Sequence, residues 1–164
     1  MRPVFTPAED LIQATGAEIR HGGDRAFYRR PVPAGSWPNH ASGDIITVPY
    51  DSTFLSKGAY YETILHELAH WSEVRLRWSG NYEMGELIAE IASSFLSCEL
   101  GIPRGEKLEN HAAYVKSWLE TMRGDHTFIF RAATQASKVT DYLLSFVRQP
   151  EDVLEPVAAE TIPF

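Results

Sequence analysis

The chain has 164 residues, a net charge of −7 and a single cysteine. This length suits one globular domain, and a hydrophobic content of 44% argues against wholesale disorder. One cysteine excludes an internal disulfide framework, and the negative charge argues against nucleic acid as the main partner of this chain. No stretch approaches the roughly 20 apolar residues of a membrane span, and the first residues do not read as a signal peptide. We therefore expect a cytoplasmic protein with no membrane partner.

The first third of the chain is predicted to hold short strands after one helix. The helix is expected over residues 6–15, because Gly16 is a typical helix end. Three strands are expected, over residues 17–21, 25–29 and 44–48. The Gly22-Gly23-Asp24 segment is a hairpin signal between the first two strands. These features predict a small antiparallel sheet.

From about Gly58 onward, apolar residues recur at helical spacing. Four amphipathic stripes follow one another, over residues 64–71, 87–96, 115–122 and 129–146. The predicted fold class is therefore α+β, with a small sheet followed by a helical bundle. Residues 1–149 are expected to form one domain, and the acidic residues 150–164 a flexible tail.

The first of these helical stripes contains the motif His66-Glu67-Leu68-Ala69-His70. Positions i and i+4 lie on the same face of a helix, so both imidazoles can bind one metal ion. Glu67 lies beside that face, where a carboxylate can act as general base on a metal-bound water. A random match to this pattern is expected only about 0.02 times in such a chain. The motif predicts a zinc site with Glu67 as catalytic residue.

A catalytic zinc needs a third protein ligand, and the next helical stripe offers two glutamates. Glu90 lies within the apolar run 87–92, where a solvated acid is not expected. A turn at residues 79–81 would let this helix return to the histidine pair. We predict Glu90 as the third metal ligand. Glu86, one helical turn earlier, is the rival ligand or a neighbour that supports the ligands.

Other polar side chains are weaker candidates. His21 and His40 are expected to be surface histidines, whereas His111 and His126 could stabilise an oxyanion. Tyrosines also flank the motif and could donate hydrogen bonds to a reaction intermediate: Tyr50, Tyr60, Tyr61 and Tyr82. Cys98 is expected to be a small buried side chain rather than a nucleophile.

The motif and its surroundings resemble the zincin-like metallopeptidase domain of ArdC-type antirestriction proteins, which also occurs in polyvalent proteins of conjugative elements and phages. The resemblance rests on residues 66–71 and on Gly85-Glu86-Leu87-Ile88-Ala89-Glu90. It extends to the segments 16–28, 44–49, 111–119 and 132–144, and so covers roughly residues 8–147.

The resemblance implies that His66, His70 and Glu90 bind zinc in a gluzincin-like arrangement and that Glu67 is the general base. It implies a hydrolase that acts on a protein or peptide, encoded on a mobile genetic element. The chain shows no counterpart of the single-stranded-DNA-binding domain that family members usually carry, so DNA binding by this chain alone is not expected. The shorter segment 72–83 is expected to leave one side of the cleft open.

Two functions remain open on this reasoning. The first is a zinc metallopeptidase, and the second is a non-catalytic, zinc-containing antirestriction or protein-interaction module. Glu67 distinguishes them, because a structural zinc site needs no general base. For the peptidase, the sequence predicts that a substrate peptide binds extended alongside the strand 44–48.

Overall fold

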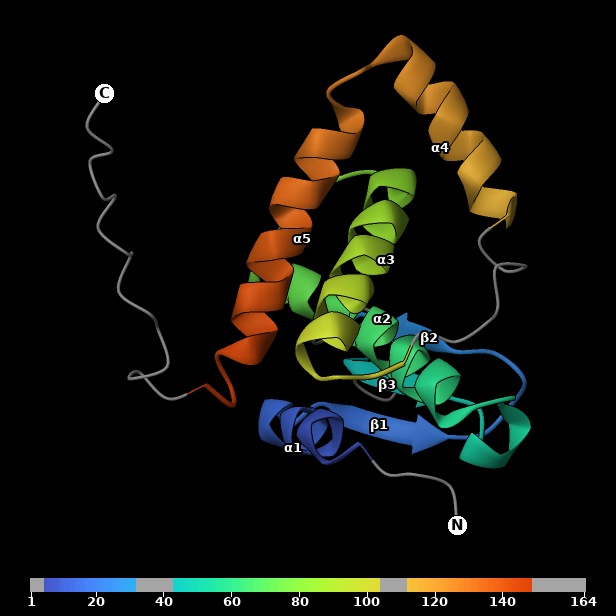
Figure 1. The fold of residues 1–164 in the computed structure, drawn as a ribbon, viewed down its shortest axis with the longest axis vertical. Coiled ribbons are helices and arrows are strands. Elements are labelled where there is room, and N and C mark those ends of the chain that lie inside the picture. The colour runs from blue at the N-terminus through green and yellow to red at the C-terminus, as the bar shows by residue number, and fades with distance from the viewer. Residues whose placement is uncertain (1–4, 32–42, 104–111, 149–164) are drawn as a thin grey trace, which may run out of the picture.

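The computed structural model describes residues 5–31, 43–103 and 112–148. The elements in chain order are the helix α1 (Thr6–Thr15), the strands β1 (Glu18–His21), β2 (Phe27–Arg29) and β3 (Ile45–Val48), a 3-10 turn (Asp51–Thr53), and the helices α2 (Lys57–Arg75), α3 (Tyr82–Glu99), α4 (Ala112–Gly124) and α5 (Phe128–Leu144) (Figure 1). The predicted α+β class is confirmed. The predicted tail, residues 150–164, lies outside the described residues.

The three strands form one sheet in the order β1-β3-β2. β3 is parallel to β1, with Glu18 opposite Ile45, and antiparallel to β2, with Tyr28 opposite Ile46. The predicted β1–β2 hairpin and the purely antiparallel sheet were therefore wrong. β3 is the most buried strand, so it takes the central position and separates the two strands that are neighbours in sequence.

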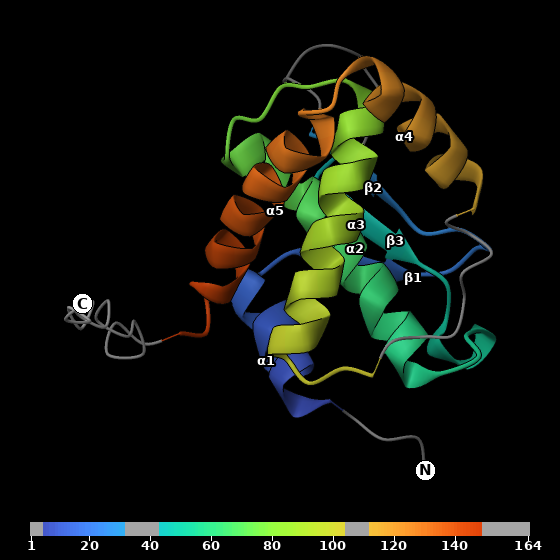
Figure 2. The same ribbon diagram turned by 45° about the horizontal axis from the view of Figure 1, so that its top comes forward.

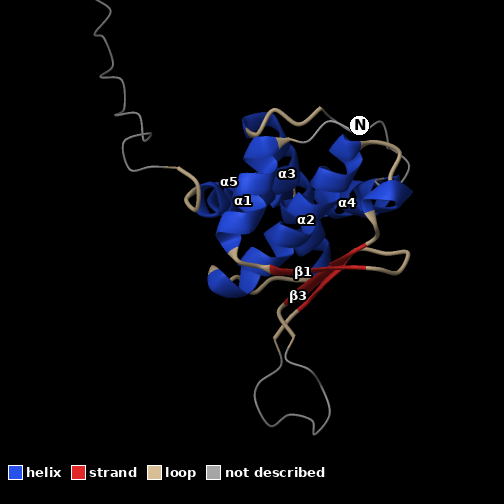
Figure 3. Cartoon of the chain, turned by 90° about the horizontal axis from the view of Figure 1, so that it is seen from below, coloured by secondary structure: helices blue, strands red, loops and turns tan. Residues whose placement is uncertain are grey.

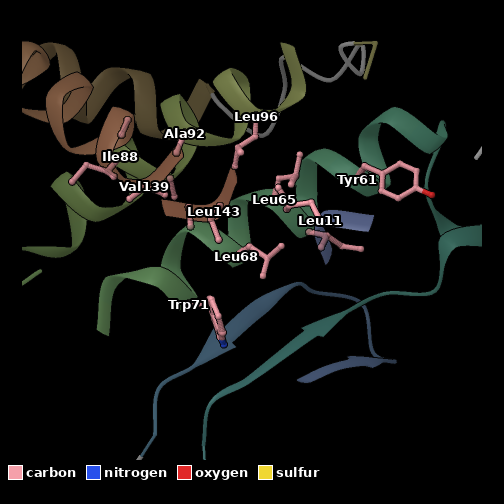
Figure 4. Close-up of a cluster of buried hydrophobic side chains, with 14 of the residues drawn as sticks. Leu11, Tyr61, Leu65, Leu68, Trp71, Ile88, Ala92, Leu96, Val139 and Leu143 are labelled. Carbon is pink, nitrogen blue, oxygen red and sulfur yellow. The ribbon is translucent and has the colours of Figure 1, made fainter. Parts of the chain in front are cut away.

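The helices lie on one side of this sheet (Figure 3). α2 packs directly on β2 and β3, while α3 and α5 pack on α2 and on each other (Figure 2). Their buried side chains form one hydrophobic core, in which Leu65 and Leu68 of α2 meet Ala92 and Leu96 of α3 and Leu143 of α5 (Figure 4). This core fixes α3 across α2.

Local signals explain where the helices begin and end. Ser56 and Asn81 are the N-caps of α2 and α3, and their side chains accept hydrogen bonds from the backbone N–H groups of Ala59 and Met84. Gly16 ends α1 in the left-handed conformation, as its position predicted. Within the described residues, no helix combines the length and apolar composition that crossing a bilayer requires.

Candidate metal centre

The motif residues lie in the middle of α2, and they face a groove of about 1230 Å³. Residues of α2, β2 and α3 line this groove. His66, Glu67 and His70 all line it, and so do Glu86 and Glu90 of α3. The fold thus brings every predicted site residue to one groove.

The two histidines and Glu86 converge on one point. The Nε2 atoms of His66 and His70 lie 3.2 Å apart. The carboxylate of Glu86 lies 3.5 Å from Nε2 of His66 and 3.4 Å from Nε2 of His70. Among the described residues, these three side chains form a group whose possible ligand atoms all lie within 4.8 Å of one another.

Glu90 lies on the other side of His66. Its Oε1 atom is 3.4 Å from Nδ1 of His66, which is the ring nitrogen that faces away from His70. The structure therefore places Glu86, rather than the predicted Glu90, beside the two converging Nε2 atoms. Both glutamates lie on the same face of α3, and the way in which α3 crosses α2 decides which of them is closer to the histidine pair.

Glu73 has the corresponding position at His70. Its Oε1 atom lies 2.8 Å from Nδ1 of His70, and its Oε2 atom accepts a hydrogen bond from Arg30. Neither Glu73 nor Arg30 was predicted from the sequence. The spacing of His70 and Glu73, three residues apart on one helix, is a signal that could have identified the glutamate. No local signal points to Arg30, which is 43 residues away from its partner.

Glu67 is buried beside the histidine pair, with 7% of its surface exposed. Burial is the main cause of a raised pKa for this carboxyl, and the charge of Glu86 adds to it, while the charges of His66 and His70 and the backbone of Tyr28 offset it only in part. Tyr28 lies in β2, so the strand at the edge of the sheet contacts the predicted general base directly.

The ionisation of the metal-free side chains reflects their crowding. Burial disfavours the charged form of His70, but hydrogen bonds and charges from Glu73 and Glu86 outweigh it and raise the pKa of His70 to about 10. Burial likewise opposes ionisation of Glu86, yet hydrogen bonds from His66 and His70 hold the pKa of this carboxyl well below its usual range. Without a metal, the neighbouring carboxylates therefore favour the protonated, positively charged form of His70.

This donor set fits a divalent cation. Each histidine has a carboxylate at Nδ1, which favours a proton on that nitrogen, so Nε2 is the nitrogen that can bind a cation once the Nε2 proton is lost. Two Nε2 lone pairs and a carboxylate oxygen cannot hydrogen-bond to one another, so a proton or a cation must lie between them. Two imidazoles and one carboxylate are ligands typical of catalytic zinc.

Most of the weaker candidates that the structure describes lie outside the groove. His21 is hydrogen-bonded to Tyr60 at 2.8 Å, and His126 is exposed; neither of them lines the groove. His40 and His111 lie outside the described residues. Of the four tyrosines singled out, Tyr82 lines the groove. Cys98 is exposed, so its predicted burial was also wrong.

Curated relatives share much of this chain's sequence. Two proteins named DNA primase TraC from Escherichia coli are 42% and 39% identical to it, over 85% and 94% of this chain. An uncharacterised protein, y4eC of Sinorhizobium fredii, is 32% identical over 83%. The chain spans only 9% and 15% of the two TraC proteins and 43% of y4eC.

Two solved structures of one antirestriction protein are also similar to this chain. The antirestriction protein ArdC from plasmid R388, in a Mn(II)-bound crystal structure, is 36% identical, with a TM-score of 0.67 over 88% of this chain and 53% of ArdC. The metal-free ArdC structure gives a TM-score of 0.66 over 85% of this chain and 49% of ArdC. A family model, MPTase-PolyVal, described as zincin-like metallopeptidase, matches residues 6–135. This chain therefore belongs to the zincin-like metallopeptidase family.

Proposed function

We propose that this chain is a metal-dependent peptidase domain in which His66, His70 and Glu86 hold one divalent cation and Glu67 is the general base. The observation that carries the proposal is the convergence of the two Nε2 atoms and the Glu86 carboxylate on one point of the groove, next to a buried glutamate. Family membership supports the same reaction class.

Glu86 is preferred to Glu90 as the third ligand because of the atoms that each carboxylate approaches. Glu86 lies 3.5 and 3.4 Å from the Nε2 atoms of the two histidines, whereas Glu90 lies 3.4 Å from Nδ1 of His66. Glu90 then orients His66 by accepting its Nδ1 proton. Metal binding by variants of the two glutamates decides between Glu86 and Glu90 as the third ligand.

We propose zinc as the cation because two imidazoles and one carboxylate, with a position left open for water or substrate, match its catalytic sites. The related ArdC structure contains Mn(II), so the manganese ion is the natural competitor in a binding assay. A cation of this kind supplies Lewis acidity, which polarises a carbonyl group and lowers the pKa of water.

Glu67 transfers the proton during peptide hydrolysis. Glu67 accepts a proton from the water whose oxygen adds to the carbonyl carbon of the peptide bond. It then returns that proton to the amide nitrogen as the C–N bond breaks, which leaves a carboxyl group and an amine. The backbone of Tyr28 favours the charged form of the Glu67 carboxylate, which is the form that accepts a proton.

The peptide would lie extended along β2. β3 was predicted for this role from the sequence, but β3 is the central strand and both of its edges are paired, so that prediction was wrong. β2 pairs with β3 alone within the described residues, and Ala26, Phe27 and Tyr28 line the groove. An extended peptide can therefore add to the outer edge of β2 beside the metal site.

Glu67→Gln tests the peptidase, because an amide keeps the volume of the side chain but cannot accept the proton. The zinc-loaded wild-type chain should cleave a library of fluorescence-quenched peptides, and the variant should bind zinc equally well yet lose about 10²–10⁴-fold in rate. Glu62→Gln is the matched control, since Glu62 lies on α2 and lines the same groove. Equal rates for wild type and Glu67→Gln would refute Glu67 as the base.

The alternative function is a non-catalytic module with an antirestriction role, as the relation to ArdC suggests. The Glu67→Gln variant separates this function from the peptidase in cells. If the wild-type chain protects incoming DNA from restriction and Glu67→Gln protects it equally, the module is favoured. If protection disappears with the variant while zinc stays bound, hydrolysis is favoured.

A further inference from the structure

We propose that Glu73, held in place by Arg30, is a positioning residue that fixes the ring of His70 with its Nε2 atom turned towards His66 and Glu86. This inference rests on the proposed metal site, but it concerns residues that the site itself does not need as ligands. Nothing in the motif requires an acid at this position, because the motif ends at His70.

The first observation is the hydrogen bond at Nδ1 of His70. Oε1 of Glu73 lies 2.8 Å from this atom, which is shorter than the 3.4 Å between Glu90 and Nδ1 of His66. A carboxylate at Nδ1 accepts the ring proton and leaves the Nε2 lone pair for a cation. Carboxylates that contact a ligand histidine in this way also orient its ring.

The second observation is the burial of the Glu73 carboxylate, whose side chain is 6% exposed. A buried carboxylate is stable only where its oxygens have partners. The guanidinium group of Arg30 supplies the partner for Oε2, while Oε1 contacts His70. One carboxylate therefore links α2 to the segment that follows β2, and each of its oxygens has a separate role.

The third observation is that α3 passes close to Glu73 at Gly85. A Cβ atom added at Gly85 would lie 3.2 Å from Oε1 of Glu73 and 3.3 Å from the ring of Trp78. The absence of a side chain at Gly85 therefore lets α3 approach the carboxylate closely. The Glu73 carboxylate thus lies between Arg30, His70 and the close approach of α3 at Gly85.

The test compares Glu73→Ala, Glu73→Gln and Arg30→Ala by zinc titration of the full chain. Glu73→Ala should weaken zinc binding about 10–100-fold, which is the usual effect of losing such a partner. Glu73→Gln keeps an oxygen that accepts the Nδ1 proton, so its loss should be below about tenfold. Arg30→Ala should have an effect smaller than that of Glu73→Ala, because the His70 contact remains.

Val139→Ala is the control for a general loss of stability, since Val139 is buried in α5 and does not line the groove. Its zinc affinity should equal that of the wild type. If Glu73→Ala also binds zinc as tightly as the wild type, the positioning role is overturned. Equal weakening by Glu73→Gln and Glu73→Ala would also overturn it, because the accepting oxygen would then be irrelevant.

A second readout does not depend on zinc. Proton NMR should detect an exchange-protected imidazole N–H of His70, assigned by its disappearance in His70→Gln. This signal should disappear in Glu73→Ala and persist in Glu73→Gln and Val139→Ala, with or without zinc. A signal that persists in Glu73→Ala refutes the contact. A wild-type chain that binds no zinc yet shows the Glu73-dependent signal overturns the proposed function and supports the contact.

Discussion

The third ligand of the proposed site can be identified by comparing Glu86→Ala with Glu90→Ala. Glu86 approaches both Nε2 atoms, at 3.5 and 3.4 Å, so its removal takes away one of three protein ligands. Glu90 contacts the far nitrogen of His66 at 3.4 Å and acts on a cation only through that ring. The two substitutions should therefore differ widely in their effect on zinc affinity.

The size of the difference follows from these contacts. Loss of a partner that contacts only a ligand typically weakens metal binding 10–100-fold, and this range is the expectation for Glu90→Ala. Loss of a metal ligand should weaken binding by more than this range. Glu86→Ala should therefore reduce zinc affinity more than about 100-fold, which corresponds to about 2.7 kcal/mol at 1.36 kcal/mol per tenfold change.

The assay is a competition between the protein and a chromogenic chelator for zinc, with circular dichroism to confirm that each variant is folded. Glu83→Ala is the matched control, because Glu83 lies on the same helix, three residues before Glu86, and is exposed. It should bind zinc like the wild type. A larger loss for Glu90→Ala than for Glu86→Ala would move the ligand one helical turn and refute the assignment to Glu86.

Two further predictions follow from β2 and its surroundings. Asp44 accepts hydrogen bonds from Arg75 and Tyr28, both at 2.8 Å, and the bond from Arg75 is the main cause that lowers the pKa of Asp44. Because a lowered pKa stabilises the fold above the unfolded value of about 3.9, the melting temperature of Asp44→Asn should fall below that of the wild type at neutral pH, and the gap should shrink as the pH drops below about 4. If the difference in melting temperature between wild type and Asp44→Asn does not vary with pH, the Asp44–Arg75 ion pair is not the cause of that difference. A photo-crosslinking amino acid at Phe27 in β2 should capture a bound peptide, whereas the same group at Ile19 in β1 should not; capture at Ile19 alone would exclude the outer edge of β2 as the peptide site.

The sequence by itself determined the features that depend on neighbouring residues. The i,i+4 spacing of His66 and His70 brings the two rings to one side of α2 as soon as that helix forms. Gly16 and Asn81 mark a helix end and a helix start through hydrogen bonds and backbone angles within a few residues. The α+β class follows from the same local periodicities.

The tertiary structure decided the features that depend on how distant segments pack. Glu86 and Glu90 lie one turn apart on the same face of α3, so helical periodicity cannot choose between them, and the angle at which α3 crosses α2 does. The order β1-β3-β2 arises because the most buried strand takes the centre of the sheet, against the local hairpin signal. Arg30 meets Glu73 across 43 residues of chain, a contact that no local pattern encodes because it exists only once β2 and α2 have packed together.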